Sequence, residues 1–334
     1  DILYLWVLRM AMTAKEFIGE IPFKAVYVHP TVLTKDGKRM SKSLGTGLNP
    51  LDLVSLYGAD ATRYSLLRQV GSMQDVRFDA EVESNVVLSS PTAENGRNFC
   101  NKLWNAARFV LMNVEGYTSS KVEDPDNLAD RWIRSRLASM IREVNGAMDS
   151  YRLSDVTRAV YDFLWRDYCD WFVEMCKTRL QRGTEVERRT AQPTLVAVLE
   201  TALRLMHPIM PYITEVLWQA LPKANDCPES VMISSWPAVD EAAIDERAEA
   251  EMTQLQQVIT AVRTIRSESN ISPGKKINLL ISCADEDLSK LYSDQGSLVQ
   301  DLVRADFVSV GSLTKNIKAI DFSMRVTPII EQRD

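Results

Sequence analysis

Helical periodicity runs through more than half of this chain, from about residue 80 to residue 268, and it limits the possible fold more than any other feature. Apolar residues recur there at the spacing of amphipathic helices, and several of the segments exceed fifteen residues. Because short loops join these long segments, neighbouring helices are expected to lie antiparallel. The sequence therefore predicts a mainly α protein built around a helical bundle.

The first eighty residues mix the patterns of helix, strand and loop. Residues 2–12 are apolar on nearly every side, which predicts a buried helix. Residues 25–29 are β-branched and aromatic and precede a proline, which predicts a short buried strand. Residues 34–45 are polar, basic and rich in glycine, which predicts a loop, and the pair Asn49-Pro50 predicts the start of a helix.

The pattern changes again after residue 272. Residues 288–304 predict a helix, strands are predicted at 276–283 and 307–310, and one or two more strands are predicted within 318–330. We therefore expect the remnant of a strand-and-helix domain, then a helical bundle, then a small α/β subdomain.

Composition excludes several classes of protein. The formal net charge of −6 argues against a chain that coats nucleic acid over its whole surface, but it leaves room for one local basic face. No apolar run is long enough to span a membrane. The five cysteines include no C-x-x-C pair, so neither a metal site nor a disulfide framework is expected. Cysteines of this kind are typical of a protein in the reducing cytoplasm.

Within the predicted loop, residues 37–45 place three cations and two hydroxyls between glycines. A flexible loop of this composition can close over a polyphosphate. Lys42 and Arg39 can then neutralise the charge that develops on a departing pyrophosphate. From charge alone, a solvated basic turn is the more frequent explanation of such a segment.

The string Arg39-Met-Ser-Lys-Ser43 resembles the second signature of the class I aminoacyl-tRNA synthetases, which usually have lysine at the position of Arg39. The run that begins at Pro50 and the tract Tyr57-Gly-Ala-Asp-Ala-Thr-Arg63 also agree with that family. The resemblance implies that Lys42 and Arg39 stabilise the transition state in which ATP activates an amino acid. It also implies contacts with ATP by four residues of this region: His29, Met40, Ser41 and Ser43.

Residues 1–10 resemble the valyl branch of the family, where the same stretch lies beside the amino-acid pocket. The resemblance implies that Ile2 and Trp6 help to line a pocket for the valine side chain. Their spacing agrees with this role, because positions i and i+4 share one face of a helix. From the pattern alone both residues are more often core residues, and isoleucyl specificity is the alternative within the family.

The helix that contains residues 97–108 interleaves cations with aromatic rings, a combination that suits RNA. It is one of five segments that resemble the anticodon-binding bundle of valyl and isoleucyl enzymes, namely 97–109, 130–137, 161–171, 205–218 and 261–274. Phe99 is equally open to stacking on an anticodon base or to packing in the core, whereas Trp104 is expected in the core. The resemblance implies tRNA contacts by Arg97, Asn98, Phe99 and Lys102.

Two further clusters have structural explanations. An aromatic stripe at helical spacing is expected in the core, and it consists of Trp165, Tyr168, Trp171 and Phe172. Arginines and glutamates crowd one short segment and predict a solvated mixed face, formed by Arg179, Arg182, Glu185, Glu187, Arg188 and Arg189.

The resemblance covers nearly the whole chain and implies its division into parts. We expect the C-terminal remnant of a Rossmann-like catalytic domain at 1–46, a connecting region that contacts the tRNA stem at 47–80, an α-helical anticodon-binding bundle at 81–270 and a small α/β subdomain at 271–334.

The implied function is part of a ligase that activates valine with ATP and Mg²⁺ and transfers it to tRNA(Val). The chain holds two histidines and lacks the His-x-Gly-His signature of the other half of the site, so alone it is expected to be inactive. We also expect a cytoplasmic monomer with no membrane contact, no metal site and no tightly bound cofactor. The alternative is an RNA-binding module of synthetase descent without catalysis, which the intact Arg39–Ser43 string disfavours.

Overall fold

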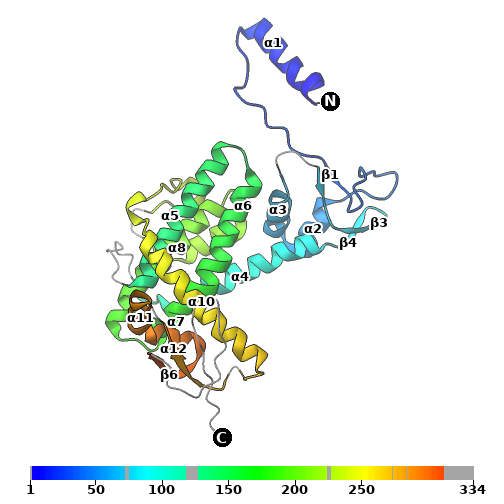
Figure 1. The fold of residues 1–334 in the computed structure, drawn as a ribbon. Helices are drawn as coiled ribbons and strands as arrows, with labels where there is room; N and C mark the ends of the chain where they lie inside the picture. The colour runs from blue at the N-terminus through cyan, green and yellow to red at the C-terminus, as the bar shows by residue number, and fades with distance from the viewer. Residues whose placement is uncertain are drawn as a thin grey trace.

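Figure 1 shows a mainly helical molecule, as predicted, in which a bundle of long helices carries smaller lobes built from the two ends of the chain. The structure is a computed structural model that describes residues 2–71, 75–117, 127–223, 227–272, 274–283 and 285–311.

The N-terminal helix stands away from the rest of the molecule (Figure 1). A π-helical turn, Leu3–Val7, continues into helix α1, Leu8–Ile18, so the predicted helix is present. Its predicted burial is wrong for the described part of the chain, since none of its residues is buried and 56% of Trp6 is exposed. Helix formation is local, whereas burial needs a second surface, and no described element covers this helix.

The strand predicted at residues 25–29 does not form, and its apolar side chains are exposed. Strand β1 is instead Val32–Leu33, and it pairs in parallel with β2, Val76–Arg77. A strand needs a partner for its backbone hydrogen bonds. Among the described residues β2 supplies that partner, and its register selects residues 32–33 rather than 25–29.

Helices α2, Pro50–Tyr57, and α3, Ala59–Arg68, follow the basic loop. Asn49 caps α2 as predicted, because its side chain accepts a hydrogen bond from the Leu51 amide and proline occupies the first turn. Helix α2 packs on a small hydrophobic core whose buried members are Leu53, Phe78, Ala80, Val87 and Ala93.

A β-hairpin lies within the stretch predicted as helical. Strands β3, Glu81–Glu83, and β4, Val86–Ser89, pair antiparallel, so the helical prediction is wrong for this segment. Ser84 and Asn85 join the strands with φ of 51° and 64°. Two consecutive left-handed residues suit a tight hairpin turn and cannot belong to a right-handed helix.

The bundle surrounds one large core in which Trp132 and Trp218 are buried. A π-helical segment, Phe163–Phe172, joins two of its helices, and all four residues of the aromatic stripe lie there. Tyr168 and Phe172 are fully buried as expected. The helices are α4, Pro91–Asn113; α5, Leu128–Asp149; α6, Leu153–Asp162; α7, Val173–Gln181; α8, Glu185–Met206; α9, Pro211–Ala220; and α10, Glu246–Glu268.

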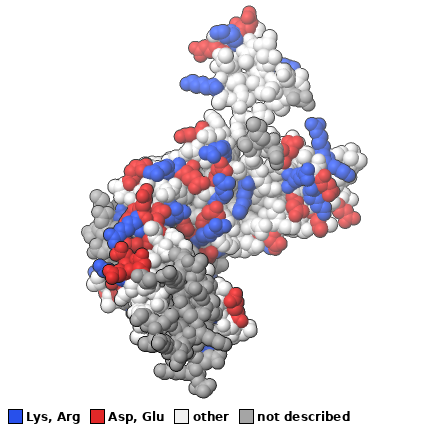
Figure 2. All heavy atoms as spheres, viewed as in Figure 1, with Lys and Arg blue, Asp and Glu red and all other residues white. Residues whose placement is uncertain are grey.

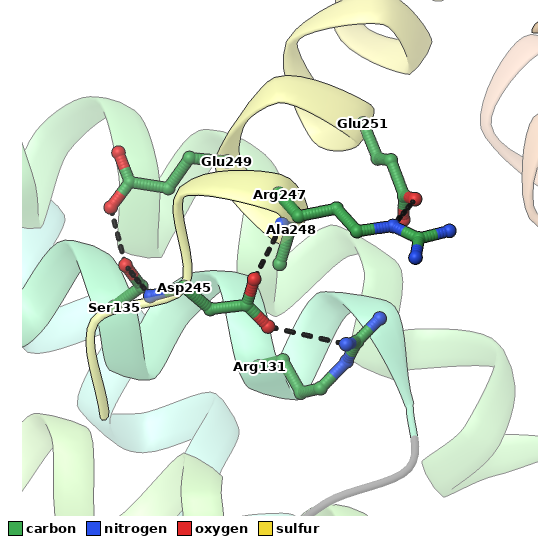
Figure 3. A network of polar contacts seen from close by, with 7 residues as sticks. All are labelled: Arg131, Ser135, Asp245, Arg247, Ala248, Glu249 and Glu251. Atoms are coloured by element: carbon green, nitrogen blue, oxygen red, sulfur yellow. Dashed lines mark hydrogen bonds and ion pairs between the residues drawn. The ribbon is translucent and has the colours of Figure 1, made fainter. Parts of the chain in front are cut away.

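Polar contacts fix the start of α10 on α5 (Figure 3). Asp245 caps α10 by accepting a hydrogen bond of 2.9 Å from the Ala248 amide, and its other oxygen pairs with Arg131 of α5 at 3.2 Å. The Ser135 hydroxyl, fully buried on α5, accepts from the Asp245 amide and donates to Glu249. Because these polar groups of α5 and α10 find their hydrogen-bond partners on the other helix, the crossing of the two helices has one favoured position.

The C-terminal lobe is an α/β unit that shares the core of the bundle. Strands β5, Ile277–Ile281, and β6, Ala305–Val310, are parallel, and both overlap predicted strands. The single helix predicted at 288–304 is wrong, because α11, Glu286–Asp294, ends before α12, Gly296–Val303, begins. Glycine favours helix ends over helix interiors, which explains the break. The one or two strands predicted within 318–330 lie outside the described residues.

Candidate functional site

The first half of the basic loop is a tight turn. The Thr34 amide donates to the Lys38 carbonyl and the Gly37 amide to the Thr34 carbonyl, each at 2.9 Å. Gly37 adopts φ of 76°, and a Cβ there would lie 3.2 Å from Nε of Arg77. Both the backbone conformation and the close approach of the guanidinium require glycine at this position.

The second half of the loop places its hydroxyls and cations at the surface. The Ser41 amide donates to the Thr46 hydroxyl at 3.0 Å, and the Ser41 and Ser43 hydroxyls lie 2.9 Å apart. Arg39 and Lys42 are exposed, and among the described residues neither has a carboxylate partner. Both charges are therefore available to an anion such as a polyphosphate.

The other residues predicted to contact ATP or valine lie farther apart than those of the Arg39–Ser43 string. Met40 packs against the small core, so it anchors the loop. His29 is exposed before β1, with its Nδ1 atom 2.9 Å from the Pro30 carbonyl oxygen. Ile2 and Trp6 are exposed in the N-terminal helical stretch, which Figure 1 shows well away from β1. The described residues thus bring Arg39 to Ser43 together but do not build a valine pocket.

Phe99 is a core residue. Its ring is 1% exposed and lies 5.0 Å from the rings of both Tyr64 and Tyr161. A base cannot reach this ring, so the predicted stacking on an anticodon base is wrong. The reason is helical phase, because Phe99 shares the inward face of α4 with the buried Leu103 and Val110.

The expectation for Trp104 is wrong as well. The sequence predicted a core position, yet 45% of this side chain is exposed. Phe99 and Trp104 are five positions apart, which places them on different sides of an α-helix. Alongside Trp104, the outer face of α4 presents Asn98, Asn101, Asn105 and Arg108.

The two predicted cations of α4 already have partners. Lys102 Nζ lies 2.6 Å from Asp170 Oδ1 and 3.7 Å from the ring centre of Trp165. Arg97 pairs with Glu94 at 2.8 Å, and its guanidinium lies 5.2 Å from the ring centre of Tyr57. Both contacts remain partly accessible to solvent, so a phosphate would have to compete with them.

A basic cleft of about 950 Å³ lies between the bundle and the C-terminal lobe. Arg263 of α10 lies 5.3 Å from the ring centre of Trp171 on one side of it. This cleft has no signature in the sequence, because its cations come from four separate segments and form no run. Its charged lining consists of Glu174, Lys177, Arg182, Arg263, Arg266, Lys276, Asp301 and Arg304.

One arginine of the predicted solvated face, Arg179, is mostly withdrawn from solvent, with 14% of its side chain exposed. The Arg179 guanidinium donates two hydrogen bonds, at 3.0 and 2.7 Å, to the two carboxylate oxygens of Asp130, whose side chain is 1% exposed. Burial raises the pKa of Asp130, and the bonds from Arg179 oppose that rise. The expectation was wrong for Arg179 because Asp130 arrives from α5, far away in the sequence. Arg188 and Arg189 remain partly exposed beside Glu185, as expected.

The tract Gly58 to Arg63 joins the loop-bearing lobe to the bundle. The Asp60 carboxylate accepts hydrogen bonds from the amides of Tyr212 and Ile213, at 3.2 and 2.6 Å, in the first turn of α9. Arg63 donates to the carbonyls of Pro208 and Ile209, each at 2.9 Å. In the sequence this tract is recognisable only as a family motif, and in the structure it forms the junction between two lobes.

Figure 2 shows lysine, arginine and acidic side chains interspersed over much of the face that it draws. Lysine and arginine side chains gather on the lobe that carries β1 to β4, with acidic side chains among them. No cluster of three metal-ligating side chains occurs among the described residues, and none of the described helices is long and apolar enough to cross a membrane. The five cysteines all lie among the described residues, and none of them forms a disulfide.

Two family models match the chain. Residues 1–79 match the class I tRNA synthetases for isoleucine, leucine, methionine and valine, and residues 130–281 match the anticodon-binding domain of tRNA ligases. The first match contains the basic loop and the Gly58 to Arg63 tract, and the second contains most of the bundle.

Three relatives of this chain are all valine–tRNA ligases. Valine–tRNA ligases of a Nostoc species and of Bacillus subtilis are each 37% identical, over 93% and 97% of this chain. That of Thermosynechococcus vestitus is 39% identical over 93% of the chain. The chain spans about a third of these relatives, since it covers 32%, 35% and 34% of their lengths respectively.

A solved structure supports the fold. The chain is similar, with a TM-score of 0.54 and 16% identity, to the Agrobacterium radiobacter LeuRS in a ternary complex with tRNA and LeuAMS. The similarity covers 93% of this chain and 36% of that one. With its loop signature, its anticodon-binding bundle and its alignment to valine–tRNA ligases over nearly its whole length, the chain belongs to the class I aminoacyl-tRNA synthetases.

Proposed function

We propose that the protein to which this sequence belongs is a valine–tRNA ligase, which joins valine to tRNA(Val) with ATP and Mg²⁺. The observation that carries the proposal is the exposed pair of cations, Arg39 and Lys42, without carboxylate partners among the described residues, in a loop that aligns with that family. In this reaction the valine carboxylate attacks the α-phosphorus of ATP and pyrophosphate leaves. The two cations would neutralise the charge on the departing pyrophosphate, while Ser41 and Ser43 offer hydrogen bonds beside it.

The proposal is tested with the full-length protein. Valine-dependent ATP–pyrophosphate exchange is the expected activity, and the described chain alone should show none because the other half of the site is needed. Stronger exchange with isoleucine than with valine would instead favour isoleucyl specificity. No exchange with either amino acid would favour an RNA-binding module of synthetase descent.

Ile2 and Trp6 are proposed to contribute to the valine pocket, with the remainder of the catalytic domain supplying its other walls. Their exposure in the described structure suits residues that meet such a partner surface. Trp6→Ala in the full-length protein should lower the preference for valine over isoleucine by about 1–3 kcal/mol, because a larger cavity admits the extra methylene. The ratio of kcat/KM values for the two amino acids measures this preference.

Tyr4→Ala is the matched control for Trp6→Ala. Tyr4 lies in the same helical stretch but two positions from both Ile2 and Trp6, and so on another face of the helix, so its removal should leave the preference unchanged. If the two variants alter the ratio equally, or neither alters it, this helix does not line the pocket.

The outer face of α4 is proposed to contact tRNA(Val), with Trp104 in the stacking role that was one of the two alternatives for Phe99. Arg97, Asn101 and Arg108 lie seven and three positions before Trp104 and four positions after it, so they share its side of α4. Asn98 and Lys102 lie toward one edge of this face. The basic cleft is proposed to hold tRNA phosphates, because its cations outnumber its carboxylates. We further propose that the protein acts as a monomer in the cytoplasm, a reducing compartment that suits cysteines without disulfides.

Trp104→Ala should weaken the binding of tRNA(Val) to the described chain by about 1–3 kcal/mol, the usual value of one base stacked on an aromatic ring. The slope of log Kd against log salt should not change, because no phosphate contact is lost. Fluorescence anisotropy with labelled tRNA measures both quantities. Trp236→Ala is the control, since Trp236 is similarly exposed elsewhere on the molecule. Equal losses in the two variants would contradict a specific role for Trp104.

A further inference from the structure

We propose that Asn85, at the tip of the β3–β4 hairpin, is a positioning residue that holds the basic loop and thereby sets the place from which Lys42 acts. The inference rests on the proposed function of the loop in ATP activation. Three hydrogen bonds connect Asn85 to the loop. Its amide donates to the Gly45 carbonyl at 3.0 Å, its Nδ2 donates to the Lys42 carbonyl at 3.0 Å, and its Oδ1 accepts from the Gly47 amide at 2.9 Å.

The local geometry is specific for this contact. Asn85 has φ of 64°, a conformation that asparagine tolerates better than most residues. A Cβ on Gly47 would lie 2.9 Å from the Asn85 Oδ1 atom, closer than such atoms normally approach. A side chain at position 47 would therefore displace the Asn85 amide group. Gly47 and Asn85 therefore fit each other, and the need for each residue type comes from the contact between the two segments.

The hairpin itself has a firm base. Val87 is buried in the small core, and its amide donates to Asp52 of α2 at 3.0 Å. The other Asp52 oxygen accepts from the Asn49 side chain at 2.9 Å. Contacts thus run from α2 through Asp52 and β4 to Asn85 and the loop, and Figure 1 shows α2 beside the hairpin.

The consequence for Lys42 is a fixed backbone with a free side chain. Its carbonyl accepts hydrogen bonds from the Gly45 amide at 3.2 Å and from Asn85, whereas its side chain is exposed. A catalytic cation costs less entropy to place when its backbone is already ordered. The hairpin would therefore contribute to the rate of activation without touching ATP.

Asn85→Gly tests this role, with Ser84→Gly as the matched control. Both positions adopt positive φ in the same turn, so glycine suits each of them, and only the change at 85 removes the side-chain bonds to the loop. In the full-length protein, Asn85→Gly should speed hydrogen exchange of the amides at 45–47 by about tenfold, the order expected for the loss of a hydrogen bond. Ser84→Gly should leave those amides unchanged, and both variants should melt within a few degrees of the parent.

Kinetics separate positioning from a merely structural role. Asn85→Gly should lower kcat for ATP–pyrophosphate exchange by about tenfold with little change in the KM for valine, because the site that is disturbed is the phosphate side. In a Lys42→Ala background the same change should cost almost nothing further, since Asn85 acts through Lys42. Asn85→Asp keeps the acceptor for the Gly47 amide and should retain part of the protection of that amide.

Three results would overturn the inference. These are unchanged exchange of the loop amides in Asn85→Gly, an equal effect in Ser84→Gly, or an undiminished loss of kcat when Lys42 is already alanine. Failure of the proposed function gives a different pattern, in which Lys42→Ala itself leaves activity intact while the loop amides still respond to Asn85→Gly.

Discussion

Replacing Lys42 with alanine in the full-length protein should lower valine-dependent ATP–pyrophosphate exchange by about a hundredfold, or about 3 kcal/mol of transition-state stabilisation. Lys42 is exposed and without a carboxylate partner among the described residues, so its charge is available to the phosphates. The removal of an exposed side chain should leave the melting temperature unchanged. The exchange rate at saturating ATP and valine is the measurement.

Lys35→Ala is the control for this prediction. Lys35 begins the same loop and is also exposed, so the variant loses the same formal charge outside the Arg39–Ser43 string. If electrostatic attraction of ATP to a basic surface were the whole effect, the two variants would fall together. A loss of less than about threefold in Lys42→Ala would contradict a role in the transition state.

Arg179→Met should destabilise the described chain by about 3–5 kcal/mol, because it leaves the buried Asp130 carboxylate without its partner. Burial already raises the pKa of Asp130 with Arg179 in place, and the variant should raise it further. A carboxyl whose pKa is higher in the folded than in the unfolded state loses stability as pH rises. The loss caused by Arg179→Met should therefore be larger at pH 8 than at pH 5, as measured by urea denaturation.

Two further variants test the physical reason for this effect. Arg189→Ala removes an exposed partner of Glu185 and should cost less than about 1 kcal/mol. Combining Arg179→Met with Asp130→Leu should recover much of the stability, because an apolar pair has no charge to desolvate. A double variant as unstable as the single one would show that the lost packing of Arg179, rather than the orphaned charge, dominates.

The sequence predicted those features that depend on neighbours along the chain. The apolar period predicted the helical bundle, the Asn49-Pro50 pair predicted a helix start, and the polar basic stretch predicted the loop. Each of these depends on residues within a few positions of each other. The resemblance added the family, to which the comparisons also assign the chain.

The features it missed depend on distant partners. The helix at 2–12 forms locally, but its burial needs a surface that the described chain does not supply. Arg179 is mostly withdrawn from solvent because it pairs with Asp130, which is far away in the sequence. Phe99 and Trp104 are both aromatic residues on one amphipathic helix, and composition alone does not say which of them faces inward. The hairpin that turns at Ser84 and Asn85 has only a weak strand pattern in the sequence, and contacts with residues 42–47 stabilise it.

The junction formed by Asp60 and Arg63 also ties the unfolding of the two lobes together. If the loop-bearing lobe unfolded alone, the first amides of α9 would lose their acceptor, and the carbonyls that precede α9 would lose the Arg63 guanidinium. If the bundle unfolded alone, the mostly buried Asp60 carboxylate would lose both of its donors. Unfolding of either lobe therefore costs hydrogen bonds in the other. In heat or urea the two lobes should unfold as one cooperative unit across this junction rather than as two independent domains.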